Sequence, residues 1–155
     1  MKEIHLTKSA GQTKEIGENL AKKIVAVKKK NGAVIVGLKG NLGGGKTTFT
    51  QGFAKGLGIK DKILSPTFVI LKKFKFQISN FKFLYHIDCY RLKNEKDLLE
   101  LGFEEIISDS NNIVLIEWPE KIKKIMPKDT IMIEFEFIDD NKRKINIATS
   151  EVAIL

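Results

Sequence analysis

Cysteine is almost absent from this chain of 155 residues, since Cys89 is the only one. A single thiol excludes an intrachain disulfide and a zinc site built from several cysteines. Every apolar run falls short of the roughly 18 residues that indicate a membrane-spanning helix. The first residues, MKEIHLTKSAG, lack the apolar core of a signal peptide. We therefore expect a cytoplasmic protein, and the length predicts a single domain over residues 1–155.

Arginine is also scarce. Arg91 and Arg143 are the only arginines among 27 basic residues, and the net charge is +8. Lysine attracts phosphate largely without specificity, whereas base recognition depends on the fork geometry of arginine. The excess of lysine therefore leaves two interpretations open. It is either a solvated surface or a basic face for RNA or an acidic partner.

Glycine, by contrast, is concentrated in one stretch. Residues 40–47 read GNLGGGKT and match G-x-x-x-x-G-K-[ST] at every fixed position. A β-branched run over residues 33–36 precedes this loop and predicts a buried strand. Apolar residues then recur at helical spacing, at Phe49, Phe53 and Leu57. The motif is thus flanked by the strand and the helix that it requires, and the Rossmann pattern G-x-G-x-x-G does not match.

The residue types in this loop suit the phosphates of a nucleotide. Glycine lets the backbone approach a ligand closely, and successive N–H groups at a helix N-terminus attract an anion. We expect Lys46 to reach the β- and γ-phosphates and the Thr47 hydroxyl to bind Mg²⁺. The predicted phosphate-binding residues are Gly43, Gly44, Gly45, Lys46, Thr47 and Thr48.

Two acidic residues follow predicted strands. Glu117 comes directly after the apolar run 113–116, and Asp88 ends the alternating run 81–87. Magnesium prefers hard oxygen ligands, commonly a carboxylate at the end of a buried strand beside the phosphate loop. We expect one acid to hold the metal, directly or through water, and the other to order the attacking water or the loop.

The remaining patterns predict an α/β fold. An N-terminal strand at 4–6 and a helix capped at Ser9 precede the glycine loop, and a further helix is expected over 94–101. Two alternating runs, 131–137 and 144–148, form a hairpin joined by 139–142. We predict a P-loop NTPase-like three-layer fold, whose mixed sheet has a parallel centre and an antiparallel C-terminal hairpin.

Four blocks in order carry a resemblance to a known family. They are 40–48, Ser65-Pro66-Thr67-Phe68, His86-Ile87-Asp88-Cys89-Tyr90-Arg91 and Ile116-Glu117-Trp118-Pro119. The chain resembles the TsaE family, the small ATPase of bacterial tRNA threonylcarbamoyladenosine synthesis. The similarity extends from the first helix to the C-terminal hairpin. Asn41 departs from the family pattern, which has an acid there, so no catalytic role is assigned to it.

The resemblance implies ATP and Mg²⁺ as cofactors, with TsaB and TsaD as partners in modifying adenosine 37 of tRNA. It implies that Glu117 is the metal-site acid, that Asp88 is the second functional acid, and that Thr67 lies where a mobile segment senses the γ-phosphate. Lys46, Asp88 and Glu117 are thus the expected catalytic residues. The segment around Thr7 is the proposed adenine contact. Whether tRNA is touched directly or indirectly stays open.

Three other functions are alternatives for a chain with this loop. A small-molecule kinase would need a lid with several arginines, which a chain with two arginines does not supply. A GTPase would need N-K-x-D, but residues 141–144 read NKRK. The last alternative is an RNA-binding or regulatory scaffold that uses ATP as an assembly signal without hydrolysing it. With no arginine evidently placed as a finger, slow intrinsic turnover is expected.

Overall fold

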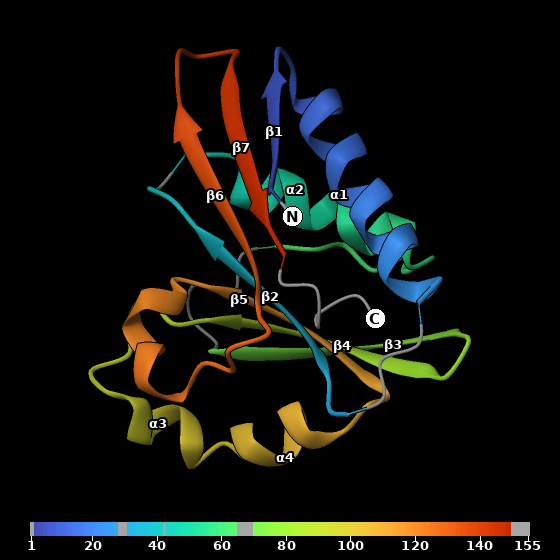
Figure 1. Ribbon diagram of the computed structural model, residues 1–155, viewed down its shortest axis with the longest axis vertical. Coiled ribbons are helices and arrows are strands. Elements are labelled where there is room, and N and C mark those ends of the chain that lie inside the picture. Colours follow the sequence, from blue (N-terminus) through green and yellow to red (C-terminus); the bar gives the residue numbers. More distant parts are fainter. Residues whose placement is uncertain (1, 28–30, 42, 65–69, 150–155) are drawn as a thin grey trace.

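A computed structural model describes residues 2–27, 31–41, 43–64 and 70–149 of the chain (Figure 1). These residues form a seven-stranded sheet with helices on both faces. The strands are β1 (Lys2–Thr7), β2 (Val34–Lys39), β3 (Leu71–Ile78), β4 (Phe81–Asp88), β5 (Asn112–Glu117), β6 (Ile131–Phe137) and β7 (Arg143–Ala148). The helices are α1 (Ala10–Val25), α2 (Lys46–Gly56), α3 (Glu95–Leu99), α4 (Phe103–Ser108) and the 3₁₀ helix η1 (Pro119–Ile125).

The strand order is β1-β7-β6-β2-β5-β4-β3. Strands β6, β2, β5 and β4 run parallel, whereas β7, β1 and β3 pair antiparallel with their neighbours. The predicted α/β fold, with its parallel centre and antiparallel C-terminal hairpin, is confirmed. Parallel strands bring their C-terminal ends to one edge, so Glu117 lies beside Leu38 of β2 on one side and Asp88 of β4 on the other.

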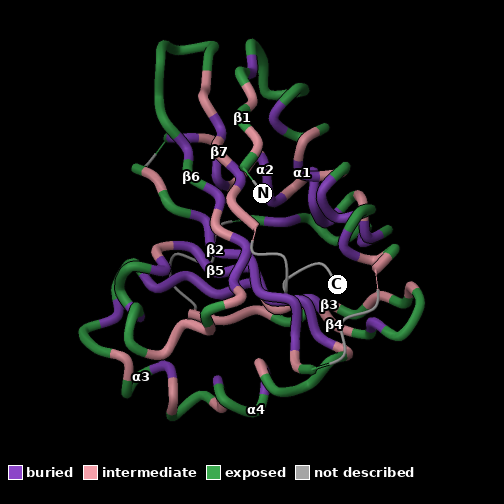
Figure 2. The backbone as a smooth tube through the Cα atoms, viewed as in Figure 1, coloured by how far each residue is buried: buried purple, intermediate pink, exposed green. Residues whose placement is uncertain are grey.

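The central strands are apolar because helices cover both of their faces. All six residues of β5 are buried, as are the first five of β2 (Figure 2). One hydrophobic core lies between the sheet and the pair α1 and α2. The second lies between the sheet and the side formed by α3, α4 and η1. Among the described residues, no helix is both long and apolar enough to cross a membrane.

Helices α1 and α2 touch through their backbones. A Cβ atom at Gly17 of α1 would overlap the carbonyl oxygen of Phe49, and one at Gly52 of α2 would overlap that of Lys14. The absence of side chains at these two positions allows the close approach. Because α2 begins directly after the glycine loop, this contact also fixes where the loop stands on the sheet.

Local sequence signals correctly predicted the start of α1 and the C-terminal hairpin. The Ser9 hydroxyl caps α1 by accepting a hydrogen bond from the Gln12 N–H at 3.2 Å. Helix α1 ends at Val25. The hairpin prediction is confirmed, since residues 139–142 connect β6 and β7.

Three expectations differ from the structure. The alternating run 81–87 predicts a strand buried on one face. In the structure Leu84 packs in the core on the α1–α2 side and Ile87 in the core on the α3–α4–η1 side, because helices cover both faces of the sheet. The helix expected over 94–101 ends at Leu99. Neither α4 nor η1 was predicted, because each is too short to show apolar periodicity.

Candidate nucleotide-binding site

The glycine loop connects β2 to α2. Gly43 and Gly45 adopt left-handed conformations, with φ of 80° and 100°, and the Gly44 N–H donates to the Asn41 carbonyl at 3.0 Å. A Cβ at Gly40 would lie 2.9 Å from the carbonyl oxygen of Phe135. Helix α2 is capped by Gly45, which has no side chain to accept from the first-turn N–H groups. The loop thus has the backbone geometry of an anion cradle.

Lys46 begins α2 and turns back over the loop. Its side chain is mostly enclosed, with 5 % of the residue exposed, and Nζ donates to the Gly40 carbonyl at 2.6 Å. The ammonium also lies 4.1 Å from the centre of the Trp118 ring. Burial lowers the pKa of Lys46, against the opposing effect of the negative charges of Glu117 and Asp88. Gly40 directly follows β2 and Trp118 directly follows Glu117, so these contacts hold the ammonium at the sheet edge where Glu117 and Asp88 lie.

Asp88 and Glu117 are aligned neighbours at the ends of β4 and β5. They are 8 % and 3 % exposed. The Asp88 carboxylate accepts a hydrogen bond from the Tyr90 N–H at 2.9 Å. Burial raises the pKa of Asp88, the Tyr90 N–H lowers it, and the charge of Glu117 raises it further. The structure therefore brings together the three residues predicted to be catalytic.

His86 lies in β4, two residues before Asp88. It is fully buried, and its Nε2 lies 2.9 Å from Oε2 of Glu117. The sequence does offer one signal for this contact, a histidine two residues before Asp88 in an otherwise apolar strand end. Its partner, however, is 31 positions away, and the pairing depends on the β4–β5 register.

Thr47 and Thr48 lie half-buried in the first turn of α2. Thr48 borders a cleft of about 170 Å³ between the start of α1, the loop and the β6–β7 turn. The other residues around this cleft are Ser9, Ala10, Thr13, Gly45, Asp140, Asn141 and Arg143. The cleft therefore adjoins the phosphate loop on the side of the first helix.

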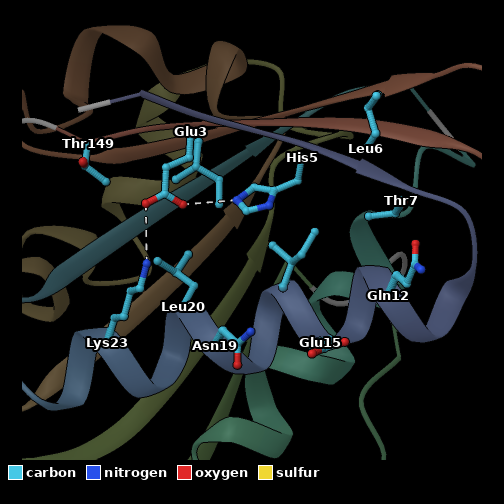
Figure 3. Close-up of a pocket in the computed structure, with 12 residues that line it drawn as sticks. Glu3, His5, Leu6, Thr7, Gln12, Glu15, Asn19, Leu20, Lys23 and Thr149 are labelled. Atoms are coloured by element: carbon cyan, nitrogen blue, oxygen red, sulfur yellow. Dashed lines mark hydrogen bonds and ion pairs between the residues drawn. The ribbon is translucent and has the colours of Figure 1, made fainter.

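Thr7, the expected adenine contact, is buried at the end of β1 and shares a 3.0 Å hydrogen bond with the Thr13 hydroxyl. It lines a second cleft of about 650 Å³ between β1 and α1 (Figure 3). There, Glu3 lies 3.1 Å from His5 Nε2 and 3.5 Å from Lys23 Nζ. Adenine binding near Thr7 stays a prediction, and Thr67 lies outside the described residues.

Arg143 connects the C-terminal hairpin to the glycine loop. Its Nη2 donates to the Gly43 carbonyl at 3.0 Å, and its Nη1 donates to the Lys142 carbonyl at 3.0 Å. The guanidinium also lies 4.7 Å from the centre of the Phe137 ring. Sequence reasoning found no arginine placed at the loop, because Gly43 and Arg143 are 100 positions apart.

The donor set fits a magnesium–nucleotide complex better than a metal held by protein alone. Within the described ranges, no three His, Cys, Asp or Glu side chains converge to form a metal site. The site instead offers two adjacent buried carboxylates, and Thr47 lies half-buried in the first turn of α2 directly after the glycine loop. Magnesium is commonly bound in this way, by one or two carboxylates together with substrate phosphates.

Comparisons with known proteins agree with one another. A family model described as "Threonylcarbamoyl adenosine biosynthesis protein TsaE" matches residues 7–145. A Rickettsia conorii protein named "tRNA threonylcarbamoyladenosine biosynthesis protein TsaE" is 39 % identical over 148 residues, which are 95 % of this chain and 78 % of that protein. A Bacillus subtilis protein of the same name is 38 % identical over 79 % of this chain and 73 % of that protein.

One solved structure provides an independent comparison of the fold. The crystal structure of Bacillus subtilis YdiB superimposes with a TM-score of 0.70 at 26 % identity. The superposition covers 96 % of this chain and 86 % of the YdiB chain. The similarity therefore includes both the helical layers and the C-terminal hairpin.

Proposed function

The chain belongs to the TsaE family, and on this premise we propose that it is a cytoplasmic, magnesium-dependent P-loop ATPase that supports tRNA threonylcarbamoyladenosine synthesis. In this proposal it binds and slowly hydrolyses ATP and acts with TsaB and TsaD on the modification of adenosine 37. One observation carries the proposal: Asp88 and Glu117 lie side by side at the sheet edge where Lys46 contacts the Gly40 carbonyl and the Trp118 ring.

Each residue has a distinct part in this proposal. The N–H groups of residues 43–48 bind the phosphates, and Lys46 exchanges the Gly40 carbonyl for phosphate oxygens as its acceptors. Thr47 and Glu117 would hold magnesium, which neutralises charge on the phosphates. Asp88 would order the attacking water. The Arg143 guanidinium bonds to loop and hairpin carbonyls, so we assign it no role as an arginine finger.

The direct test is phosphate release from ATP by the purified chain at several magnesium concentrations. We expect slow release by the wild type. In the Glu117→Ala variant, magnesium-dependent release should be lost while part of the nucleotide affinity, measured by calorimetry, is retained. Unchanged hydrolysis by this variant would remove Glu117 from the metal site. No heat of binding with magnesium and ATP for intact wild-type protein would overturn the ATPase proposal.

The scaffold alternative calls for a second experiment. Co-purification with TsaB and TsaD, with and without ATP, tests the proposed partners. Reconstituted tRNA modification with Lys46→Ala then separates hydrolysis from assembly, because full modification by this variant would favour a scaffold. A small-molecule kinase would instead transfer labelled phosphate to an acceptor and release none to water.

A further inference from the structure

His86 is a buried polar group at the site to which the proposed function assigns no role. It is 0 % exposed, and Glu117, whose Oε2 lies 2.9 Å from its Nε2, is 3 % exposed. Bulk water therefore does not compete for this contact. We propose that His86 is a positioning residue, which donates its Nε2–H to Glu117 and holds that carboxylate in the orientation that binds the magnesium–nucleotide complex. This inference rests on the proposed function.

The surroundings of the two His86 ring nitrogens indicate which of them carries the proton. Within the described part of the chain, His86 Nδ1 has no hydrogen-bond partner. A neutral imidazole carries one proton, either on Nδ1 or on Nε2. A proton on Nδ1 would leave a buried N–H without an acceptor and would set a bare Nε2 against a carboxylate oxygen. The proton on Nε2 avoids both costs and makes His86 the donor to Glu117.

Strand geometry explains why this contact bears on the site. Strands β4 and β5 run parallel, and Asp88 is aligned with Glu117 while His86 is aligned with Leu115. Side chains two positions apart on a strand point to the same face, so His86 lies on the same face as Asp88. The Glu117 carboxylate is thus held through Oε2 by His86, and Asp88 lies beside Glu117 on the neighbouring strand. Removing such a bond to a metal-binding carboxylate typically costs about 10- to 100-fold in metal affinity or activity.

The length of the side chain provides a sharp test. In His86→Gln the amide N–H₂ can occupy the place of the imidazole Nε2, whereas the shorter side chain of His86→Asn ends near the place of Nδ1. The measurement is ADP affinity by calorimetry at a series of magnesium concentrations, and again with a chelator. Magnesium should increase the ADP affinity of the wild type. In His86→Asn, the magnesium concentration that gives half of this increase should be about 10-fold higher or more. In His86→Gln, this magnesium concentration should stay within about 3-fold of the wild-type value.

Asn112→Ala is the matched control. Asn112 sits at the other end of β5, is 3 % exposed and donates to the Ile106 carbonyl at 2.9 Å. The variant therefore loses one buried side-chain hydrogen bond far from the nucleotide. We expect a lowered melting temperature with wild-type magnesium dependence. Equal shifts in Asn112→Ala and His86→Asn, or no shift in His86→Asn, would overturn the proposal. If the wild type shows no magnesium-dependent ADP binding, the proposed function itself fails.

A measurement on the wild type stands apart from the folding of any variant. The chain has only two histidines, His5 and His86, so the imidazole nitrogen signals of a ¹⁵N-histidine-labelled sample are readily assigned. We expect His86 to carry its proton on Nε2. We also expect the Nε2 resonance to shift when magnesium is added to the ADP-bound protein. A proton on Nδ1 would contradict the proposed donor role.

Discussion

The two edges of the central parallel strands contrast sharply. At the C-terminal edge, charged groups are buried together: Lys46, Asp88 and Glu117 are each less than 9 % exposed. At the N-terminal edge, Val34 is the first residue of β2 and Ile113 follows Asn112, the first residue of β5. The apolar side chains of Val34 and Ile113 are 4 % and 0 % exposed. The same strands thus continue a hydrophobic core at one end and carry desolvated charge at the other.

The contrast teaches that stability and chemistry are located at different ends of the same elements. Burying charge costs free energy unless it is matched by partners, whereas burying apolar surface contributes stability. We therefore expect substitutions at the C-terminal edge to change nucleotide chemistry with little loss of stability. Substitutions at the N-terminal edge should do the reverse.

The largest expected effect is at the C-terminal edge. Lys46→Ala should lower the rate of ATP hydrolysis by about 10³-fold, or about 4 kcal/mol, because it removes the ammonium that lies over the glycine loop. The melting temperature should stay close to that of the wild type. Phosphate release and thermal unfolding measured on the same sample check both statements. Hydrolysis within a few-fold of the wild type would break the contrast.

At the N-terminal edge, Ile113→Ala should lower the free energy of unfolding by about 3 kcal/mol, because it leaves a cavity in the core between β5 and α1–α2. The affinity for magnesium–ADP should not change at temperatures where the variant is folded. Urea unfolding and calorimetry provide the two measurements. A matching fall in affinity would mean that the two edges are coupled through the strand.

Asp88 should show the cost of buried charge. The pKa of Asp88 is raised, so the folded state holds the carboxyl proton more tightly than the unfolded state does. The protonated carboxyl therefore stabilises the fold fully at pH values below 3.8, its ordinary pKa, and this stabilisation is lost as pH rises through the raised pKa. At neutral pH, Asp88→Asn should therefore raise stability by about 1 kcal/mol, or about 2–4 °C, while hydrolysis falls. The difference in melting temperature should grow between about pH 4 and pH 7. A difference that shrinks over this range would contradict the assignment.

The smallest expected effect concerns the hairpin. Arg143→Lys should weaken ADP binding by about 3-fold, since one ammonium cannot replace a guanidinium that bonds to several carbonyls at once. Calorimetry measures this change, and Lys142→Arg, which leaves the guanidinium of Arg143 in place, is the control. Unaltered affinity in Arg143→Lys would show that the tie to Gly43 does not shape the loop.

The contrast also explains how far the sequence could be interpreted. The glycine loop, its flanking strand and helix, and the acids at 88 and 117 were predicted because each signal is local: a motif, a period or a polar residue ending an apolar run. The contacts of His86 with Glu117 and of Arg143 with Gly43 join residues 31 and 100 positions apart. Those pairings depend on strand order and register, which no local pattern specifies.

The close backbone approach of α1 to α2, at Gly17 and at Gly52, has one more consequence. Main-chain atoms of α1 and α2 meet directly there, and α2 begins directly after the glycine loop. The position of the loop therefore does not depend on side-chain rotamers or on the identity of the surface residues on α1. Substitutions on the outer face of α1 should therefore leave the position of the glycine loop unchanged. Conversely, a methyl group added at Gly17 or Gly52 would push the two helices apart. It would thereby shift the glycine loop although no residue of the loop is changed.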